Sequence, residues 1–450
     1  MAKIEYQEIK NLDTLKDLFS RHKVNKVVIK NLSPNDNSKN QLYLGMGFDA
    51  AQVFPHTSII PDQSQSSRPE PKFKADLDFS WIDATGRIDP TPHAQLILYP
   101  KYPEVRFSGF LRGANFQLTD LMGTQARIEG RLMIWGISGN KIIGHVISPE
   151  NPLAIHLKSE FLDPNTLLNE YNSLNLRQTS KELLIRKLLE IHNKGWISSY
   201  RLDGNGNRIE YNKPNSGGYT LEAEFGITPN GYSEPDFIDW ELKQYSVNAF
   251  DKLYKKVITL MTPEPTGGIY KNSGVKDFIL RYGYEDKNGK PDRLNFGGIH
   301  KVGEFHHLTD LKLILSGYDS IKNKIVDAFG AIQLIDHDDN VAAEWSFSSL
   351  LEHWNRKHRH AAYIPSMKRI ESGSVQYQYG NLIQLGENTD FLLFLKAMSI
   401  QSVYYDPGIK MENVSSESPK TKRRSQFRIA IPDLTTLYQD FNTVNILDVQ

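Results

Sequence analysis

The residues best suited to chemistry lie in the stretch 219–245, where carboxylates and one lysine recur at short spacing. In its second half, the apolar residues Ile238, Trp240 and Leu242 alternate with charged ones, which is typical of a strand with one face on a core and the other towards a cleft or solvent. Glu241 and Lys243 would project from the same face, about 6.5–7 Å apart along the strand. The turn-forming pair Pro235-Asp236 just before this strand can direct a further carboxylate to that face.

Two or three carboxylates beside one lysine match the needs of metal-dependent phosphodiester hydrolysis. Hard oxygen ligands hold Mg²⁺ and leave it several waters and a substrate oxygen, and the ion lowers the pKa of the attacking water. The ammonium lies near the nucleophile and the developing charge. A third carboxylate, Glu222 or Glu224, lies in an apolar segment that we expect to form a nearby helix. The alternative is a solvated strand face with cross-strand ion pairs, which the alternation alone favours.

A longer pattern around these residues changes that balance. The order Pro235-Asp236, four residues, Glu241, one residue and Lys243 resembles the PD-(D/E)XK nuclease motif. With its flanks, residues 221–226 and 235–243, it resembles the MvaI/BcnI restriction endonucleases and their relative, the mismatch-repair nickase MutH. We therefore favour the nuclease interpretation.

The resemblance implies a role for each residue of the motif. In such enzymes a glutamate at the corresponding position belongs to the active site, so Glu222 would act as an assisting carboxylate. Asp236, Glu241 and the carbonyl of Leu242 would bind Mg²⁺, and Lys243 would orient or activate the water. The cleaved DNA would carry a 5′-phosphate.

Composition indicates a soluble globular protein with more than one domain. The chain has 450 residues, 39% hydrophobic and 24% charged, and this length suggests two or three domains. It contains no run as long as a transmembrane helix and no secretory signal at its start. There are no cysteines, which excludes disulfides, thiolate zinc sites and cysteine nucleophiles. The 53 basic and 53 acidic residues balance, so any DNA binding must depend on local patches.

The amino-terminal third is rich in strand patterns. A helix is expected over 11–19, and strands are expected over 26–30, 41–44, 73–82, 94–99, 105–110, 126–136 and 141–146. No helix pattern separates the later strands, which indicates a β-rich domain, a barrel. The following stretch to residue 180 carries no firm element pattern and is the best linker. A capping box, either Ser180 with Leu183 and Leu184 or Thr179 with Glu182, then predicts a helix over 181–192.

Within this β-rich domain, residues 30–36 and 40–43 and the Val-Phe-Pro step ending at residue 55 resemble the amino-terminal effector domain of EcoRII restriction enzymes. The resemblance implies a DNA-binding pseudobarrel whose two loops, about 33–40 and 100–112, enter the major groove. Asparagine, arginine and glutamate side chains there suit adenine, guanine and cytosine respectively. The residues expected to contact DNA are Asn35, Asn40, Lys101, Glu104, Arg106 and Arg112. The alternative for each is a solvated polar loop.

The carboxyl-terminal region holds a second candidate DNA surface. Five basic residues fall within 420–428, beside a Ser-rich stretch, as a groove-entering loop requires; a surface turn is the alternative. Segments recurring in MvaI-like enzymes extend that resemblance over about 185–445. The residues expected to contact DNA here are Arg281, Asp406, Lys422, Arg423, Arg424 and Arg428. The histidine cluster 353–360, with its basic residues 355–360, has poor spacing for zinc and is interpreted as a solvated or phosphate-facing helix end.

We therefore expect a multidomain protein, with a β-rich DNA-binding pseudobarrel (1–160), a linker (161–180) and an α/β PD-(D/E)XK restriction-endonuclease-like domain (181–450). The resemblances imply a type IIE restriction endonuclease that uses Mg²⁺ and binds double-stranded DNA at two sites, one per domain, with the sequence CCWGG (W is A or T). It would act as a monomer in a bacterial or archaeal cytoplasm, away from membranes and alongside a cognate DNA methyltransferase. Two alternatives stay open: a MutH-like nickase that needs a mismatch-recognition partner, and a DNA-binding regulator with a degenerate nuclease fold.

Overall fold

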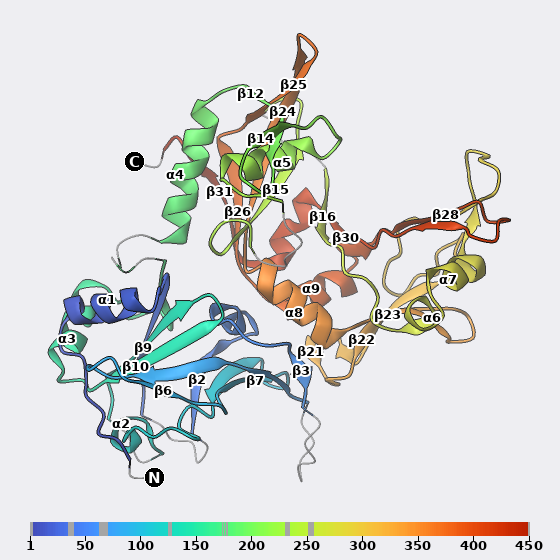
Figure 1. The fold of residues 1–450 in the computed structure, drawn as a ribbon. Helices are drawn as coiled ribbons and strands as arrows, with labels where there is room; N and C mark the ends of the chain where they lie inside the picture. Colours follow the sequence, from blue (N-terminus) through green and yellow to red (C-terminus); the bar gives the residue numbers. More distant parts are fainter. Residues whose placement is uncertain are drawn as a thin grey trace. The chain divides into compact units, whose positions relative to one another are not determined.

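The structure is a computed structural model of the chain, and it describes residues 3–34, 40–62, 71–124, 128–172, 174, 176, 179–229, 235–250 and 256–448. The chain divides into unit 1, residues 1–184, and unit 2, residues 185–450. Figure 1 colours both along the sequence. No helix in these ranges is long and apolar enough to cross a membrane.

Unit 1 is built on two sheets, with strand orders β11-β1-β9-β10-β5-β6 and β2-β8-β7-β4-β3 (Figure 1). The strands of the first sheet are β1 (Lys26–Leu32), β5 (Asp78–Ile82), β6 (Ile88–Pro90), β9 (Arg131–Ser138), β10 (Lys141–Ile147) and β11 (Asn169–Tyr171). Those of the second are β2 (Gln41–Met46), β3 (Ile60–Pro61), β4 (Phe73–Asp76), β7 (Gln95–Tyr99) and β8 (Glu104–Ser108). Strands are present in each segment where the patterns predicted one, but the single strand expected over 73–82 is divided into β4 and β5, which belong to different sheets. The stretch to residue 180, which showed no firm element pattern, contains helix α3 (Pro152–Glu160) and strand β11.

The core of unit 1 lies between these sheets, where aromatic side chains of both meet. Phe107 on β8 packs edge-on against Trp135 on β9 and Phe79 on β5, with ring centroids 6.1 and 5.1 Å apart. The opposite face of the first sheet is covered by α1 (Leu12–Arg21) and α3 (Pro152–Glu160), whose Leu18 and Leu157 share one apolar cluster with β1 and β9. The short helices α2 (Thr119–Met122) and η1 (Asp49–Val53) complete the unit.

The largest sheet of unit 2 has the order β12-β25-β24-β26-β31, and β15 pairs in parallel with β24. Its strands are β12 (Ile197–Ser198), β15 (Trp240–Ser246), β24 (His360–Glu371), β25 (Ser374–Tyr379), β26 (Leu382–Thr389) and β31 (Tyr438–Asn445). Helices α8 (Phe347–Lys357) and α9 (Phe391–Ser399) pack together through Trp354 and Phe394, with ring centroids 4.7 Å apart. Because α8 leads directly into β24, the end of this helix lies at the edge of the sheet where β15 begins.

Helix α4 (Ser180–Asn193) begins as the sequence predicts. Glu182 Oε2 accepts the N–H of Thr179 at 2.9 Å, and Thr179 Oγ1 accepts the N–H of Glu182 at 3.3 Å. The capping box is therefore confirmed. A β-hairpin, β13 (Tyr200–Leu202) and β14 (Arg208–Glu210), separates α4 from α5 (Ser216–Glu224).

Smaller sheets complete unit 2, with orders β16-β30-β27, β19-β22-β23 and β17-β18-β28-β29. Their strands are β16 (Val257–Met261), β17 (Tyr284–Glu285), β18 (Arg293–Gly297), β19 (Lys312–Ser316), β22 (Ala331–Ile335), β23 (Val341–Ser346), β27 (Val403–Tyr405), β28 (Gly408–Glu412), β29 (Lys420–Lys422) and β30 (Phe427–Ala430). The remaining elements are α6 (Gly268–Asn272), α7 (Val275–Tyr282), β20 (Tyr318–Asp319), β21 (Lys324–Ile325) and η2 (Ile431–Leu437). Figure 1 shows α7 beside β28. Strand β28 pairs with β29, which carries basic residues.

Candidate active site

Strand β15 sets the positions of one carboxylate and the motif lysine. It pairs in parallel with β24, which places Glu241 opposite Ala361. Trp240, 1% exposed, packs on the ring of His360 with centroids 5.1 Å apart and fixes the start of the strand. Glu241 and Lys243 lie on one face, as a period of two predicts, with Lys243 Nζ 2.5 Å from Glu241 Oε1.

The strand begins later than the alternation indicates. Ile238 lies in a turn closed by hydrogen bonds between the backbones of Phe237 and Trp240, with a φ of 58° that β-branched residues rarely adopt. It is 43% exposed, so the expectation that it is a core residue of the strand is wrong. This turn carries Asp236 back over the strand, where its Oδ2 accepts the N–H of Leu242 at 2.9 Å.

Helix α5 supplies the third carboxylate, from Glu222. A Cβ added to Gly217 would lie 2.9 Å from Gln244 Oε1, which shows that the helix lies close to β15. Burial raises the pKa of Glu222 to about 7, and the charges of Asp236 and Glu241 contribute to this shift. The structure thus brings the three carboxylates to one site.

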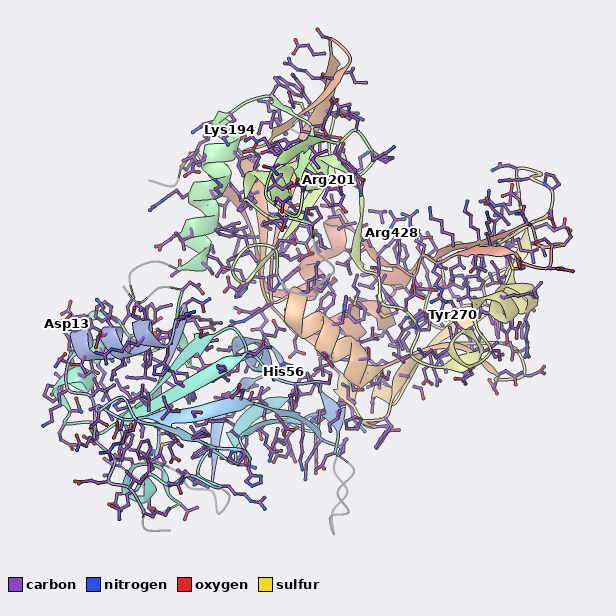
Figure 2. The ribbon with its side chains drawn as sticks, viewed as in Figure 1. Asp13, His56, Lys194, Arg201, Tyr270 and Arg428 are labelled. Carbon is purple, nitrogen blue, oxygen red and sulfur yellow. The ribbon has the colours of Figure 1, made fainter. Side chains whose placement is uncertain are left out.

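The neighbouring carboxylate of α5, Glu224, points elsewhere. Its Oε1 accepts a hydrogen bond from the Tyr200 hydroxyl at 2.7 Å, and its Oε2 forms an ion pair with Lys194 at 2.5 Å. Lys194 is labelled in Figure 2. Glu224 therefore fastens α5 to the end of α4 and to β13, and of the two glutamates considered from the sequence it is Glu222 that faces Asp236.

The electrostatics of the site favour a divalent cation. Burial raises the pKa of Glu241, Lys243 acts against this shift and Asp236 adds to it. The Oε2 atom of Glu241 is buried and accepts no hydrogen bond from any residue that the structure describes. A buried anionic oxygen without a donor is costly, and a hard cation would remove that cost. No group of three or more His, Asp or Glu side chains in the described ranges is arranged as a metal site.

A second lysine, missed by the sequence analysis, also reaches this site. Lys357 is the last residue of α8, and its Nζ lies 3.4 Å from Glu241 Oε1, the oxygen that Lys243 also contacts. The next residue, His358, is 1% exposed, and burial lowers its pKa well below the usual value. The solvated helix end is therefore wrong for His358, and a phosphate-facing role for the partly exposed Lys357 stays a prediction. The sequence offered one signal for this position of Lys357, namely that the basic residues come directly before an apolar strand pattern.

The residues of unit 2 expected to contact DNA fall in different places. Asp406 and Arg428, which is labelled in Figure 2, form an ion pair at 2.5 Å, where β27 and β30 are neighbours. Arg281 lies on α7 and pairs with Asp336 at 3.2 Å. Three further basic residues are exposed on β29 and directly after it: Lys422, Arg423 and Arg424.

The residues of unit 1 expected to contact DNA differ in their exposure. Asn35 is outside the described residues, and Asn40 directly precedes β2. Arg106 Nε donates a hydrogen bond to Glu104 Oε1 at 2.9 Å, so these two side chains pair with each other on β8. Lys101 and Arg112 are exposed on either side of that strand.

Comparison with known proteins assigns a family to unit 2. Residues 185–438, more than half of the chain, match the MvaI/BcnI restriction endonuclease family. Two similar solved structures are the complex of restriction endonuclease MvaI with its cognate DNA substrate (19% identity, 60% of this chain, 99% of that chain, TM-score 0.44) and MvaI without DNA (18%, 59%, 98%, TM-score 0.33). No curated protein matches the chain. The family match contains α5 and β15 and therefore the whole carboxylate–lysine site.

Proposed function

Because the chain belongs to the MvaI/BcnI restriction endonuclease family, we propose that unit 2 hydrolyses phosphodiesters of double-stranded DNA at a specific sequence. The observation that supports this most is the convergence of Glu222, Asp236, Glu241 and Lys243 from a helix, a turn and a strand. A solvated strand face would not bury Glu241 to 2% exposure and leave one of its oxygens without a donor. A degenerate nuclease fold would have no reason to keep the complete set.

Each residue of the site has its own role in hydrolysis. Asp236, Glu241 and the carbonyl of Leu242 would hold Mg²⁺. When bound there, the ion polarises the phosphodiester and lowers the pKa of the attacking water. Lys243, held by Glu241, presents its ammonium to the attacking oxygen and to the charge that develops on phosphate. Glu222, with a pKa of about 7, can take up a proton near neutral pH.

We assign Lys357 as a positioning residue of the same site. It contacts Glu241 Oε1 together with Lys243, so two ammonium groups hold this oxygen and leave Oε2 for the ion. The two cations also favour the ionised carboxylate, against the burial that opposes it.

Water attack would break the bond between phosphorus and the 3′ oxygen, leaving a 3′-hydroxyl and a 5′-phosphate.

Unit 1 is, in this proposal, an effector domain that binds a second copy of the DNA site, as in type IIE enzymes. The support is the resemblance of residues 30–43 to EcoRII-type effector domains, together with its two-sheet architecture. In domain order the chain resembles the type IIE enzyme UbaLAI. We propose CCWGG as the target, a cognate DNA methyltransferase as the functional partner, and action as a monomer in a bacterial or archaeal cytoplasm.

The test separates cleavage from binding. Lys243→Ala should abolish cleavage of a CCWGG plasmid in Mg²⁺ and leave binding to a CCWGG duplex in EDTA nearly unchanged. Loss of binding instead would mean that the lysine is structural and would contradict its assignment. Supercoiled plasmid substrate also distinguishes double-strand cutting from the persistent single nick that a MutH-like enzyme would leave.

A further inference from the structure

A cavity of about 300 Å³ in unit 1 lies between the end of β1 and the start of β2 and is lined by residues of both sheets. The end of β1, strands β2 and β8, the residues after α2 and the start of β9 surround it. Among its lining residues are Lys30, Asn40, Tyr43, Arg106 and Arg131. Two of the residues expected to contact DNA, Asn40 and Arg106, thus share one cavity with two further cationic side chains.

These two side chains, Lys30 and Arg131, are exceptional in their burial. They are 6% and 3% exposed, and no other lysine or arginine is among the buried residues in the described part of the chain. In the pairing of β1 with β9, Lys30 lies opposite Met133 and Leu32 opposite Arg131, so both cations project from the face that looks towards β2 and β8. The fold places its two buried cations side by side.

Among the residues that the structure describes, neither cation has a carboxylate partner. Arg131 is held by main-chain oxygens, donating to the carbonyls of Ile128 at 2.7 Å and Ser33 at 3.2 Å and also to that of Leu121. Lys30 makes no hydrogen bond or ion pair with any residue described in the structure. Its pKa is lowered by burial to about 8, so it is still mainly an ammonium at neutral pH. Burying an unpaired charge is costly, and an anion in the cavity would offset that cost.

We propose that this cavity binds a phosphate group through Lys30 and Arg131. The favoured source is the backbone of the effector DNA, because Asn40 and Arg106 on the same cavity are the side chains proposed to read its bases. That choice of source rests on the proposed function of unit 1, whereas the phosphate chemistry rests only on the two cations. A free phosphate or nucleotide would use the same groups.

The test follows amide hydrogen exchange of β1 and β9 peptides in the full chain, in EDTA, during titration with a CCWGG duplex and, separately, with inorganic phosphate. These peptides belong to unit 1 and therefore report on the unit that holds the cavity. For the wild type we expect protection by the duplex, with a midpoint that rises with salt. Lys30→Gln should raise this midpoint about tenfold and reduce the salt slope by about one, as the loss of one phosphate contact predicts.

Two variants guard against a folding artefact. Lys30→Arg keeps the charge and should retain protection, and Lys141→Gln, which removes an exposed lysine at the start of β10, should behave as the wild type. Protection by inorganic phosphate alone, lost in Lys30→Gln, would support the phosphate site and overturn DNA as its source. Absence of protection by both probes, or equal midpoints for Lys30→Gln and the wild type, would overturn the proposal.

Discussion

The pKa of Glu222 leads to a quantitative prediction for the metal-free chain. Burial, with help from Asp236 and Glu241, raises this pKa from 4.5 to about 7. The folded chain therefore keeps a proton that the unfolded chain loses above pH 4.5, so the free energy of unfolding of unit 2 falls as the pH rises from 4.5 to about 7. At about 1.4 kcal/mol per pKa unit, the loss amounts to about 3 kcal/mol, an upper figure because Glu222 is only partly buried.

Glu222→Gln removes the titrating group at nearly constant size, so this contribution should disappear. The assay is amide hydrogen exchange of α5 and β15 peptides in EDTA between about pH 5 and pH 8, corrected for the intrinsic exchange rate at each pH. The wild type should lose protection across this range, and Glu222→Gln should lose markedly less. Glu285→Gln, which changes an exposed carboxylate on β17, should follow the wild type. Equal slopes for wild type and Glu222→Gln would refute the argument that this carboxyl is held protonated beside two others.

Two further substitutions test the surroundings of the site. Lys357→Gln should lower the cleavage rate about a hundredfold with little effect on DNA affinity, whereas Lys396→Gln, an exposed lysine on α9, should leave both unchanged; an equal drop in affinity would contradict a positioning role. Gly217→Ala should destabilise unit 2 by about 1–3 kcal/mol in urea unfolding, because the new Cβ would lie 2.9 Å from side-chain atoms of Gln244 and Tyr377. Gly218→Ala, whose Cβ would meet nothing within 4 Å, should be neutral or slightly stabilising, and identical effects of the two changes would exclude the close approach of α5 to β15.

Local signals in the sequence predicted many elements of the fold. The Thr179–Glu182 capping box fixes the start of α4, since it involves only residues within one turn. The period of two placed Glu241 and Lys243 on one face of β15 for the same reason. The same periodicity misplaced Ile238, because a turn with positive φ interrupts the strand before it begins.

Local signals in the sequence could not predict contacts between distant segments of the chain. Lys357 reaches Glu241 only because α8 runs into β24 and β24 pairs in parallel with β15, and neither fact follows from a motif. Residue patterns also left Glu222 and Glu224 open, and only the family resemblance selected Glu222, because the choice depends on which face of α5 meets β15 and which meets Tyr200. In unit 1, strand patterns gave the sheets, but the burial of Lys30 depends on their packing.

The most direct measurement is cleavage of plasmids with one, two or no CCWGG sites in Mg²⁺, with and without a short CCWGG duplex added in trans. We expect fast double-strand cutting of the two-site plasmid, and of the one-site plasmid only when the duplex is added. Equal cutting of all three plasmids would contradict the site assignment. Absence of cutting under every condition would contradict the proposed nuclease function of the carboxylate–lysine site.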